Sequence, residues 1–327
     1  MKIGIVGAGA IGGYFAGRLA HFGQDVSILA RGKTLDAIRA HGIRLESEGQ
    51  QFNERIKASD RAGDLGVQDV VILAVKAPSL PAAAQSIAPL LGPRTIVAPA
   101  LNGLPWWYFL ASSGALAGHR LGAVDPAGVL EKTVPLASLV GCVVFPACSS
   151  PAPGVIKHAS GNRIVFGEPR GGSSARVDTL GQIFRDAGFA AESSDNIRQE
   201  IWLKLLGNMC FNPVSVLVGC STDRLIDDPR LHGMMAQMMS EAITLGSALG
   251  IHVDIKPEAR LAFTRKLGVV KTSTLQDVEA GRPIEIDGIL GTVVEAAGAI
   301  GCPVPLLSAV YALTRKRADV LGLLPSV

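Results

Sequence analysis

The chain opens with a strand, turn and helix pattern that few folds outside the α/β class accommodate. Residues 2–6 (KIGIV) form an apolar run typical of a buried strand, and a G-x-G-x-x-G segment follows at once. In such a segment the first glycine allows the tight turn, the second lets backbone N–H groups approach a pyrophosphate, and the third lets the helix pack on the strand. We therefore expect a dinucleotide here, the alternative being a glycine-rich turn of another α/β protein. The residues concerned are Gly7, Ala8, Gly9, Ala10, Ile11 and Gly12.

Length and composition limit the class of protein. With 327 residues the chain can form two domains, and its 48% apolar and 18% charged residues are typical of a globular protein. The net charge of +3 comes from scattered basic residues, which argues against a nucleic-acid partner. The uncharged stretches 95–118 and 296–314 are broken by prolines, so we expect no membrane-spanning helix. Five cysteines without a C-x-x-C pair indicate reduced thiols in a cytoplasmic protein and no metal site.

Apolar strands alternate with amphipathic helices in the first half of the chain, which predicts a Rossmann-type parallel sheet. From about residue 196 the pattern becomes helical, with few strand signals. We therefore predict an α/β protein with a dinucleotide-binding domain at residues 1–195 and an all-α substrate domain at residues 196–327. The predicted strands are 2–6, 26–30, 43–45, 69–75, 95–98, 139–144, 155–158 and 163–166.

The end of the second predicted strand distinguishes between the two nicotinamide cofactors. NAD sites usually place an acidic residue there to bind the ribose 2′-hydroxyl, but this chain reads LARGK at 29–33. Arg31 and Lys33 suit a 2′-phosphate, which predicts NADP(H); solvated basic residues are the alternative. Two further strand ends should reach the same crevice. There Lys76 can contact a phosphate or carboxylate and Asn102 can hold nicotinamide or substrate, or either can simply cap a turn.

A second candidate site lies in the helical half. Lys204, Asn208 and Asn212 are spaced i, i+4, i+8, so a helix would place them on one face. A lysine and two amides are unfavourable in a hydrophobic core, because buried polar groups need hydrogen-bond partners. They are suited to binding a small oxygen-rich substrate. A surface lysine is the alternative for Lys204 alone. Pro213 should kink or end this helix.

Another polar cluster follows closer to the C-terminus. Ser273 and Asp277 are four residues apart and should share a helical face. Gly281 and Pro283 mark a helix stop and the next helix start, which puts Glu285 in a first turn, where the helix dipole favours its ionised form. A helix-start carboxylate with no other role is the alternative for Glu285.

Together these residues resemble the ketopantoate reductases (2-dehydropantoate 2-reductases), nearly from end to end. The specific parts are the W-x-K-x-x-x-N-x-x-x-N stretch at 202–212 and STLQDVEAGRPIEID at 273–287. The other shared segments are GAGAIGG at 7–13, Arg31, VKA at 75–77, Asn102-Gly103, PGVIKH at 153–158 and FGEP at 166–169. The resemblance implies that Lys204 is the general acid and that Glu285 binds substrate and positions this lysine. The substrate-site residues that it implies are Asn102, Asn208, Asn212 and Ser273.

The resemblance also implies an NADP-dependent oxidoreductase, in which hydride passes from NADPH to C2 of 2-dehydropantoate and gives pantoate for pantothenate and coenzyme A synthesis. A different small 2-oxo acid is one alternative, and a non-catalytic NADPH-binding sensor is another. Two departures bear on the substrate. The bulky residues Trp106 and Trp107 either line the pocket or bury the loop, and Thr222 lies where family members often carry asparagine. A homodimer is compatible with the sequence, which contains no heptad or patch that defines an interface.

Overall fold

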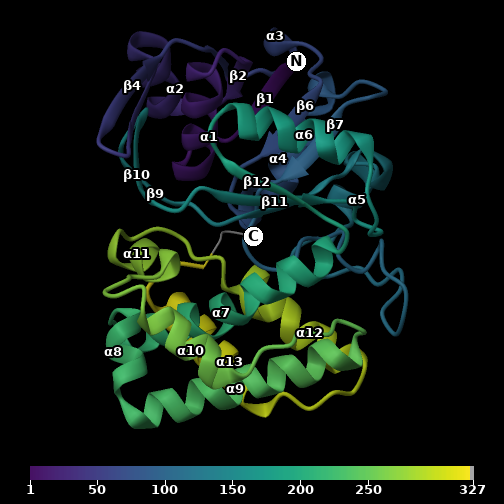
Figure 1. The fold of residues 1–327 in the computed structure, drawn as a ribbon, viewed down its shortest axis with the longest axis vertical. Helices are drawn as coiled ribbons and strands as arrows, with labels where there is room; N and C mark the ends of the chain where they lie inside the picture. Colours follow the sequence, from purple (N-terminus) through teal and green to yellow (C-terminus); the bar gives the residue numbers. More distant parts are fainter. Residues whose placement is uncertain (325–327) are drawn as a thin grey trace. The chain divides into compact units, whose positions relative to one another are not determined.

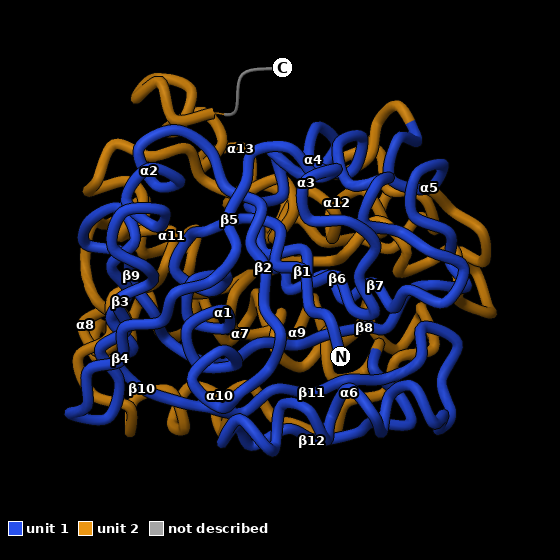
Figure 2. The backbone as a smooth tube through the Cα atoms, turned by 90° about the horizontal axis from the view of Figure 1, so that it is seen from above, with its two compact units in different colours: residues 1–101, 128–197 blue, residues 102–127, 198–327 orange. Residues whose placement is uncertain are grey.

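The computed structural model describes residues 1–324, which form two compact units (Figure 2). Unit 1 contains residues 1–101 and 128–197, and unit 2 contains residues 102–127 together with the chain from residue 198 onward. The sequence pattern predicts one division at residue 195, and that boundary between functional domains stays a prediction. The compact units also group the segment 102–127 with the helical half, which periodicity alone does not indicate.

Unit 1 is built on a five-stranded parallel sheet with the order β5-β2-β1-β6-β7 (Figure 1). Its strands are β1 (Lys2–Val6), β2 (Asp25–Leu29), β5 (Lys57–Ser59), β6 (Val70–Leu73) and β7 (Ile96–Pro99). Counted along the chain this is the order 3-2-1-4-5, which reverses between β1 and β6. The predicted Rossmann-type sheet is therefore confirmed. In such sheets a ligand binds at the carboxyl ends of the strands beside this reversal.

Two smaller sheets complete the strands of unit 1. One has the order β4-β3-β10-β9 and the other the order β12-β11-β8. The strands are β3 (Ile43–Ser47), β4 (Gln50–Glu54), β8 (Gly141–Val144), β9 (Ala147–Ala152), β10 (Val155–Ser160), β11 (Arg163–Gly167) and β12 (Ala190–Ser194). The sequence pattern does not predict β4, β5, β9 and β12, because these strands are short or carry mostly polar, exposed side chains.

Six helices flank these sheets, and a group of aromatic side chains packs within the mostly aliphatic core between them. Phe15 on the first helix meets Phe184 and Phe189 edge to face, with ring centroids 5.3 and 5.6 Å apart, and all three side chains are buried. The helices of unit 1 are α1 (Ala10–His21), α2 (Gly32–His41), α3 (Ala62–Leu65), α4 (Leu80–Ser86), α5 (Val129–Thr133) and α6 (Ala175–Asp186).

Among the described residues unit 2 contains helices and no strand, which confirms the predicted all-α half. Its helices are α7 (Ile197–Val218), α8 (Thr222–Asp227), α9 (Pro229–Ala248), α10 (Pro257–Arg265), α11 (Ser273–Glu279), α12 (Thr292–Ala299) and α13 (Pro305–Val320), with a π-helical turn at Asp287–Gly291. The sequence predicts that Pro213 kinks or ends α7, and of these the end is wrong, since the helix continues to Val218. A proline removes one backbone hydrogen bond, and the buried face of a long helix outweighs that loss.

Helix α7 is the one helix among residues 1–324 whose length and composition would allow it to cross a membrane. However, 72% of its most apolar window is buried in the protein, as in the core helix of a soluble protein. Packing therefore accounts for its apolar character.

The segment between β7 and α5 is hydrogen-bonded to the helices of unit 2. Tyr108 Oη donates to the carbonyl of Arg198 at the start of α7, at 2.9 Å. Glu295 on α12 accepts from the backbone N–H groups of Gly122 at 2.7 Å and Ala123 at 2.9 Å. These hydrogen bonds explain why residues 102–127, which follow β7 in the sequence, belong to unit 2.

Arg176 ties the start of α6 to the end of β11 by a charged contact and to the start of β8 by a hydrogen bond. Arg176 Nε donates to Glu168 at 2.7 Å, and Ser174 donates to the same carboxylate at 2.6 Å. Arg176 also donates to the carbonyl of Leu139, just before β8, at 3.0 Å. The hydrogen bonds from Arg176 hold the pKa of Glu168 below its usual value of 4.5. The glutamate of the FGEP segment thus has a structural role.

Glu168→Gln should lower the free energy of unfolding by about 2 kcal/mol at neutral pH, because Arg176 loses a charged hydrogen-bond partner. The folded pKa of Glu168 is lowered, so its contribution is present above the unfolded pKa and is lost as the pH falls through the folded pKa. Urea unfolding at neutral pH and at about pH 3 should therefore show a difference that shrinks in acid. The control Glu192→Gln removes the exposed partner of Arg163 and should cost less than about 1 kcal/mol. A difference that does not depend on pH would contradict the assignment.

Candidate active site

The three glycines of the turn after β1 each have a different surrounding. Gly7 has φ +102°, and a Cβ there would lie 2.8 Å from the carbonyl oxygen of Ala74. At Gly12 a Cβ would lie 1.9 Å from the carbonyl oxygen of Gly7, so helix and strand approach as closely as backbone allows. At Gly9 a Cβ would meet nothing within 4 Å. Open space therefore lies over Gly9 alone of the three.

This space fits the pyrophosphate of a dinucleotide. Helix α1 begins at Ala10, its N-cap Gly9 provides no side-chain cap, and its first turn contains no acidic residue. The amino end of a helix favours an anion through its backbone N–H groups and its dipole. All six residues predicted from the glycine motif lie at this turn, at the carboxyl end of the central strand β1.

The predicted 2′-phosphate residues follow the neighbouring strand. Arg31 is the N-cap of α2 and Lys33 lies in its first turn, and both are exposed. That first turn contains no acidic residue, so no carboxylate opposes a phosphate there. Lys76 follows β6, where its carbonyl accepts from the N–H of Ser79 at 2.9 Å, and its side chain is half-buried. Asn102, by contrast, belongs to unit 2.

Helix α7 presents Lys204 and Asn208 on a half-buried face. The ammonium of Lys204 donates to Oδ1 of Asn102 at 2.8 Å. Such a bond fixes the direction of an otherwise flexible lysine side chain. Because Oδ1 of Asn102 accepts from the lysine, the amide N–H groups of Asn102 are what it can donate to a ligand oxygen. The structure thus brings together two residues that the sequence places 102 positions apart.

Lys204, Asn208 and Asn212 form a polar stripe along α7. Asn212 is the most buried of the three, at 4% exposed. Its Nδ2 donates to Oγ1 of Thr274 at 3.0 Å, and Ser215 shares a hydrogen bond of 2.7 Å with Thr272. The bonds tie α7 to the start of α11, where Thr272 caps the N–H of Leu275 at 3.1 Å. The sequence pattern does not indicate Ser215, and it places Thr272 and Thr274 beside Ser273 without assigning them a role. The capping pattern at Thr272 is the signal that identifies the two threonines.

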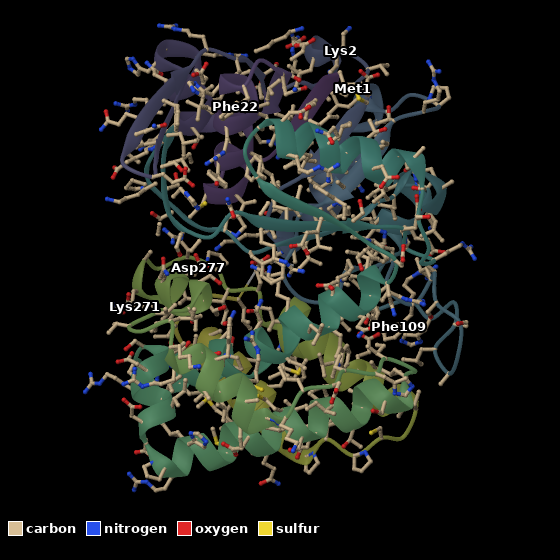
Figure 3. The ribbon with its side chains drawn as sticks, in the orientation of Figure 1. Met1, Lys2, Phe22, Phe109, Lys271 and Asp277 are labelled. Carbon is tan, nitrogen blue, oxygen red and sulfur yellow. The ribbon has the colours of Figure 1, made fainter. Side chains whose placement is uncertain are left out.

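Ser273 is the first residue of α11 and is exposed, whereas Asp277 is 8% exposed and accepts from Nε of Arg282 at 3.0 Å. Figure 3 labels Asp277 and Lys271, which lie on either side of Ser273 along the chain. Helical spacing predicts a common face for Ser273 and Asp277, but their surroundings differ. Of these two residues, only the exposed Ser273 is accessible to a ligand that approaches from solvent.

Glu285 lies just before the π-helical turn rather than in a first helical turn as predicted. Its side chain is half-buried, and its carbonyl accepts from the N–H of Ile289 at 3.1 Å. The next turn of chain touches the segment that carries Asn102. A Cβ at Gly103, which has φ +85°, would lie 2.0 Å from the carbonyl oxygen of Gly288, and Leu104 N donates to that oxygen at 3.1 Å. Glu285 and Asn102 are therefore carried by two segments in direct backbone contact.

The two departures from the family pattern are both buried. The residues from Trp106 to Phe109 are at most 2% exposed, so they bury the loop and do not face a site open to solvent. Thr222 begins α8, is 3% exposed, and its N–H donates to the carbonyl of Val270 at 2.9 Å.

Two family models match this chain. Ketopantoate reductase PanE/ApbA covers residues 3–171, and its C-terminal model covers residues 196–318. The chain belongs to the ketopantoate reductase family. The 2-dehydropantoate 2-reductase of Mesorhizobium japonicum is 44% identical over 323 residues, covering 98% of this chain and 99% of the relative. The family resemblance predicted from the sequence is thereby confirmed.

Solved structures are similar over the same length. A crystal structure described as a putative ketopantoate reductase from Ralstonia solanacearum has a TM-score of 0.95 at 44% identity, covering 98% of this chain and 99% of that one. The ternary structure of D-mandelate dehydrogenase with NADH and anilino(oxo)acetate has a TM-score of 0.86 at 22% identity, covering 99% and 100%. The second likeness shows a shared fold.

Gly9→Ala should weaken NADPH binding about tenfold without lowering the melting temperature, because the added methyl group enters the space that the phosphate requires. Gly12→Ala is the matched variant and should lower the melting temperature, since its Cβ would clash with the Gly7 carbonyl. Thermal unfolding and fluorescence titration with NADPH separate the two effects. Unchanged NADPH affinity in Gly9→Ala would mean that the phosphate lies elsewhere.

Proposed function

We propose that this protein is an NADPH-dependent reductase that converts 2-dehydropantoate to pantoate. The observation that carries the proposal is the hydrogen bond from Lys204 to Asn102, which aims a proton donor across a half-buried polar face. The Mesorhizobium japonicum relative carries the name of this activity. The same proposal places the enzyme in the cytoplasm as a homodimer, with no membrane or nucleic-acid partner.

Residues at three strand ends would hold the cofactor. The backbone of residues 7–12 receives the pyrophosphate at the start of α1, and Arg31 and Lys33 pair with the 2′-phosphate. Lys76 follows β6 beside the reversal of strand order and adds a positive charge there. When bound, the nicotinamide supplies the hydride.

Residues of unit 2 would hold the substrate and complete the reduction. Reduction of the C2 carbonyl leaves a developing alkoxide, which the Lys204 ammonium stabilises and then protonates. Asn102 directs that ammonium, and Glu285 binds the substrate and helps to position Lys204. Asn208 and Ser273 supply further polar contacts, while Asn212 holds α7 to α11 and lines the inner end of the stripe.

Purified protein should oxidise NADPH, followed at 340 nm, in the presence of 2-dehydropantoate, and Lys204→Ala should reduce kcat at least about a hundredfold while NADPH still binds. The control Lys316→Ala removes an exposed lysine paired with Asp319 and should leave turnover unchanged. A panel of other 2-oxo acids, including phenylglyoxylate, tests the substrate.

Each other outcome of that assay is informative. A higher kcat/KM for another 2-oxo acid would replace the proposed substrate. Binding of NADPH without turnover of any acid would favour a sensor. Near-normal turnover by Lys204→Ala would refute its role as the proton donor.

Arg31→Ala should weaken NADPH binding at least tenfold, or about 1.4 kcal/mol, and change NADH binding far less, because only NADPH carries the 2′-phosphate. Titration of both cofactors measures the ratio. The control Arg94→Ala removes the same charge before the amino end of β7. An equal loss for NADPH and NADH in Arg31→Ala would contradict the assignment.

A further inference from the structure

The π-helical turn at Asp287–Gly291 lies between two parts of the candidate site. Glu285 lies two residues before the turn begins. The carbonyl of Gly288, within the turn, accepts from the N–H of Leu104 at 3.1 Å, and Leu104 lies two residues beyond Asn102. Thr292 Oγ1 donates to the same carbonyl at 2.9 Å. A π turn has poorer geometry than an α-helix and persists where its surroundings hold it. Whatever holds this turn therefore sets the positions of Asn102 and Glu285.

The side chain of Asp287 anchors the turn to α13. Tyr311 Oη donates to Asp287 Oδ1 at 2.6 Å, and Arg315 Nε donates to the same oxygen at 3.2 Å. Burial and the neighbouring Asp287 carboxylate raise the pKa of Tyr311, so the phenol stays protonated and remains a donor. Arg315 is about half exposed, which makes its contribution the weaker of the two.

The ring of Tyr311 also lies directly against the turn. A Cβ at Gly291 would come within 2.9 Å of the Tyr311 hydroxyl and 3.1 Å of the ring carbon that bears it. A side chain at the last residue of the π turn would therefore push the tyrosine away from its place beside Asp287. The turn is held at its first residue by a hydrogen bond and at its last residue by close packing.

We propose that Tyr311, acting through Asp287, is a positioning residue for the proton donor Lys204. The chain of contacts runs from Tyr311 to Asp287, from the adjacent Gly288 carbonyl to Leu104, and from Asn102 to the Lys204 ammonium. This inference rests on the proposed reductase function. Loss of the anchor lets the π turn relax, so that Asn102 no longer directs the ammonium at the substrate.

Tyr311→Phe keeps the ring and removes the hydrogen bond. Its kcat with 2-dehydropantoate should fall about tenfold, with the KM for NADPH unchanged, because small misplacements of a catalytic group are costly. In an Asn102→Ala background, where the link to Lys204 is already broken, the same change should cost less than about twofold. An equal loss in both backgrounds, or no loss in either, would overturn the proposal.

Gly291→Ala independently tests the packing of the Tyr311 ring against the π turn, since the added Cβ would displace Tyr311. It should reproduce the loss of kcat. Gly298→Ala on α12 is the matched control, because a Cβ there meets nothing within 4 Å, and its kcat should equal that of the wild type. Full activity in Gly291→Ala would contradict the proposed contact.

A readout without turnover separates this inference from the proposed function. Acetylation by limiting acetic anhydride, followed by mass spectrometry, gives the reactivity of Lys204 relative to the exposed Lys57 in β5. This ratio should change at least about twofold in Tyr311→Phe, because the shifted Asn102 no longer holds the ammonium in one direction. If the wild type reduces no 2-oxo acid, a changed ratio still supports the positioning role. An unchanged ratio would refute it, whatever the enzyme reduces.

Discussion

The arrangement of the candidate site depends on one backbone contact, that of Gly103 against Gly288. A Cβ at Gly103 would lie 2.0 Å from the Gly288 carbonyl oxygen, and the left-handed backbone at φ +85° excludes most other residues. This contact fixes the segment that carries Asn102 to the turn that follows Glu285. The hydrogen bond from Lys204 to Asn102 then attaches α7 to the same point. Three segments far apart in the sequence thus depend on a position with no side chain.

In the function that we propose, the two units recognise their ligands by different means. Unit 1 offers backbone N–H groups at the start of α1, and its glycines are defined by what a side chain would exclude. Unit 2 offers side chains whose directions are set by other side chains, as Asn102 directs Lys204. A phosphate needs little more than oriented amides and positive charge, whereas a proton donor must point at one atom. The second kind of site therefore requires more supporting structure.

This difference explains how much the sequence predicts. The glycine turn is a local feature, so the strand before it, the helix after it and the close backbone approach at Gly7 and Gly12 could be predicted from the start of the sequence. The helical face of Lys204 and Asn208 follows from spacing in the same way. The partnership of Lys204 with Asn102 is not local, and the family resemblance indicated that both residues belong to the site without giving their contact. The helix does not end at Pro213, because burial of a long helix outweighs one missing hydrogen bond.

The polar stripe on α7 shows that residues with the same helical spacing can have different roles. Periodicity treats Lys204, Asn208 and Asn212 alike, yet the first two are half-buried and Asn212 is 4% exposed. A buried amide without a partner would be destabilising, and Thr274 supplies that partner from α11. Asn212 therefore couples α7, the helix that carries Lys204, to α11, the helix that begins with Ser273. At one end of this stripe the half-buried Lys204 and Asn208 are open to a ligand, and at the other end the buried Asn212 holds two helices together. The exposure of each side chain distinguishes the two roles.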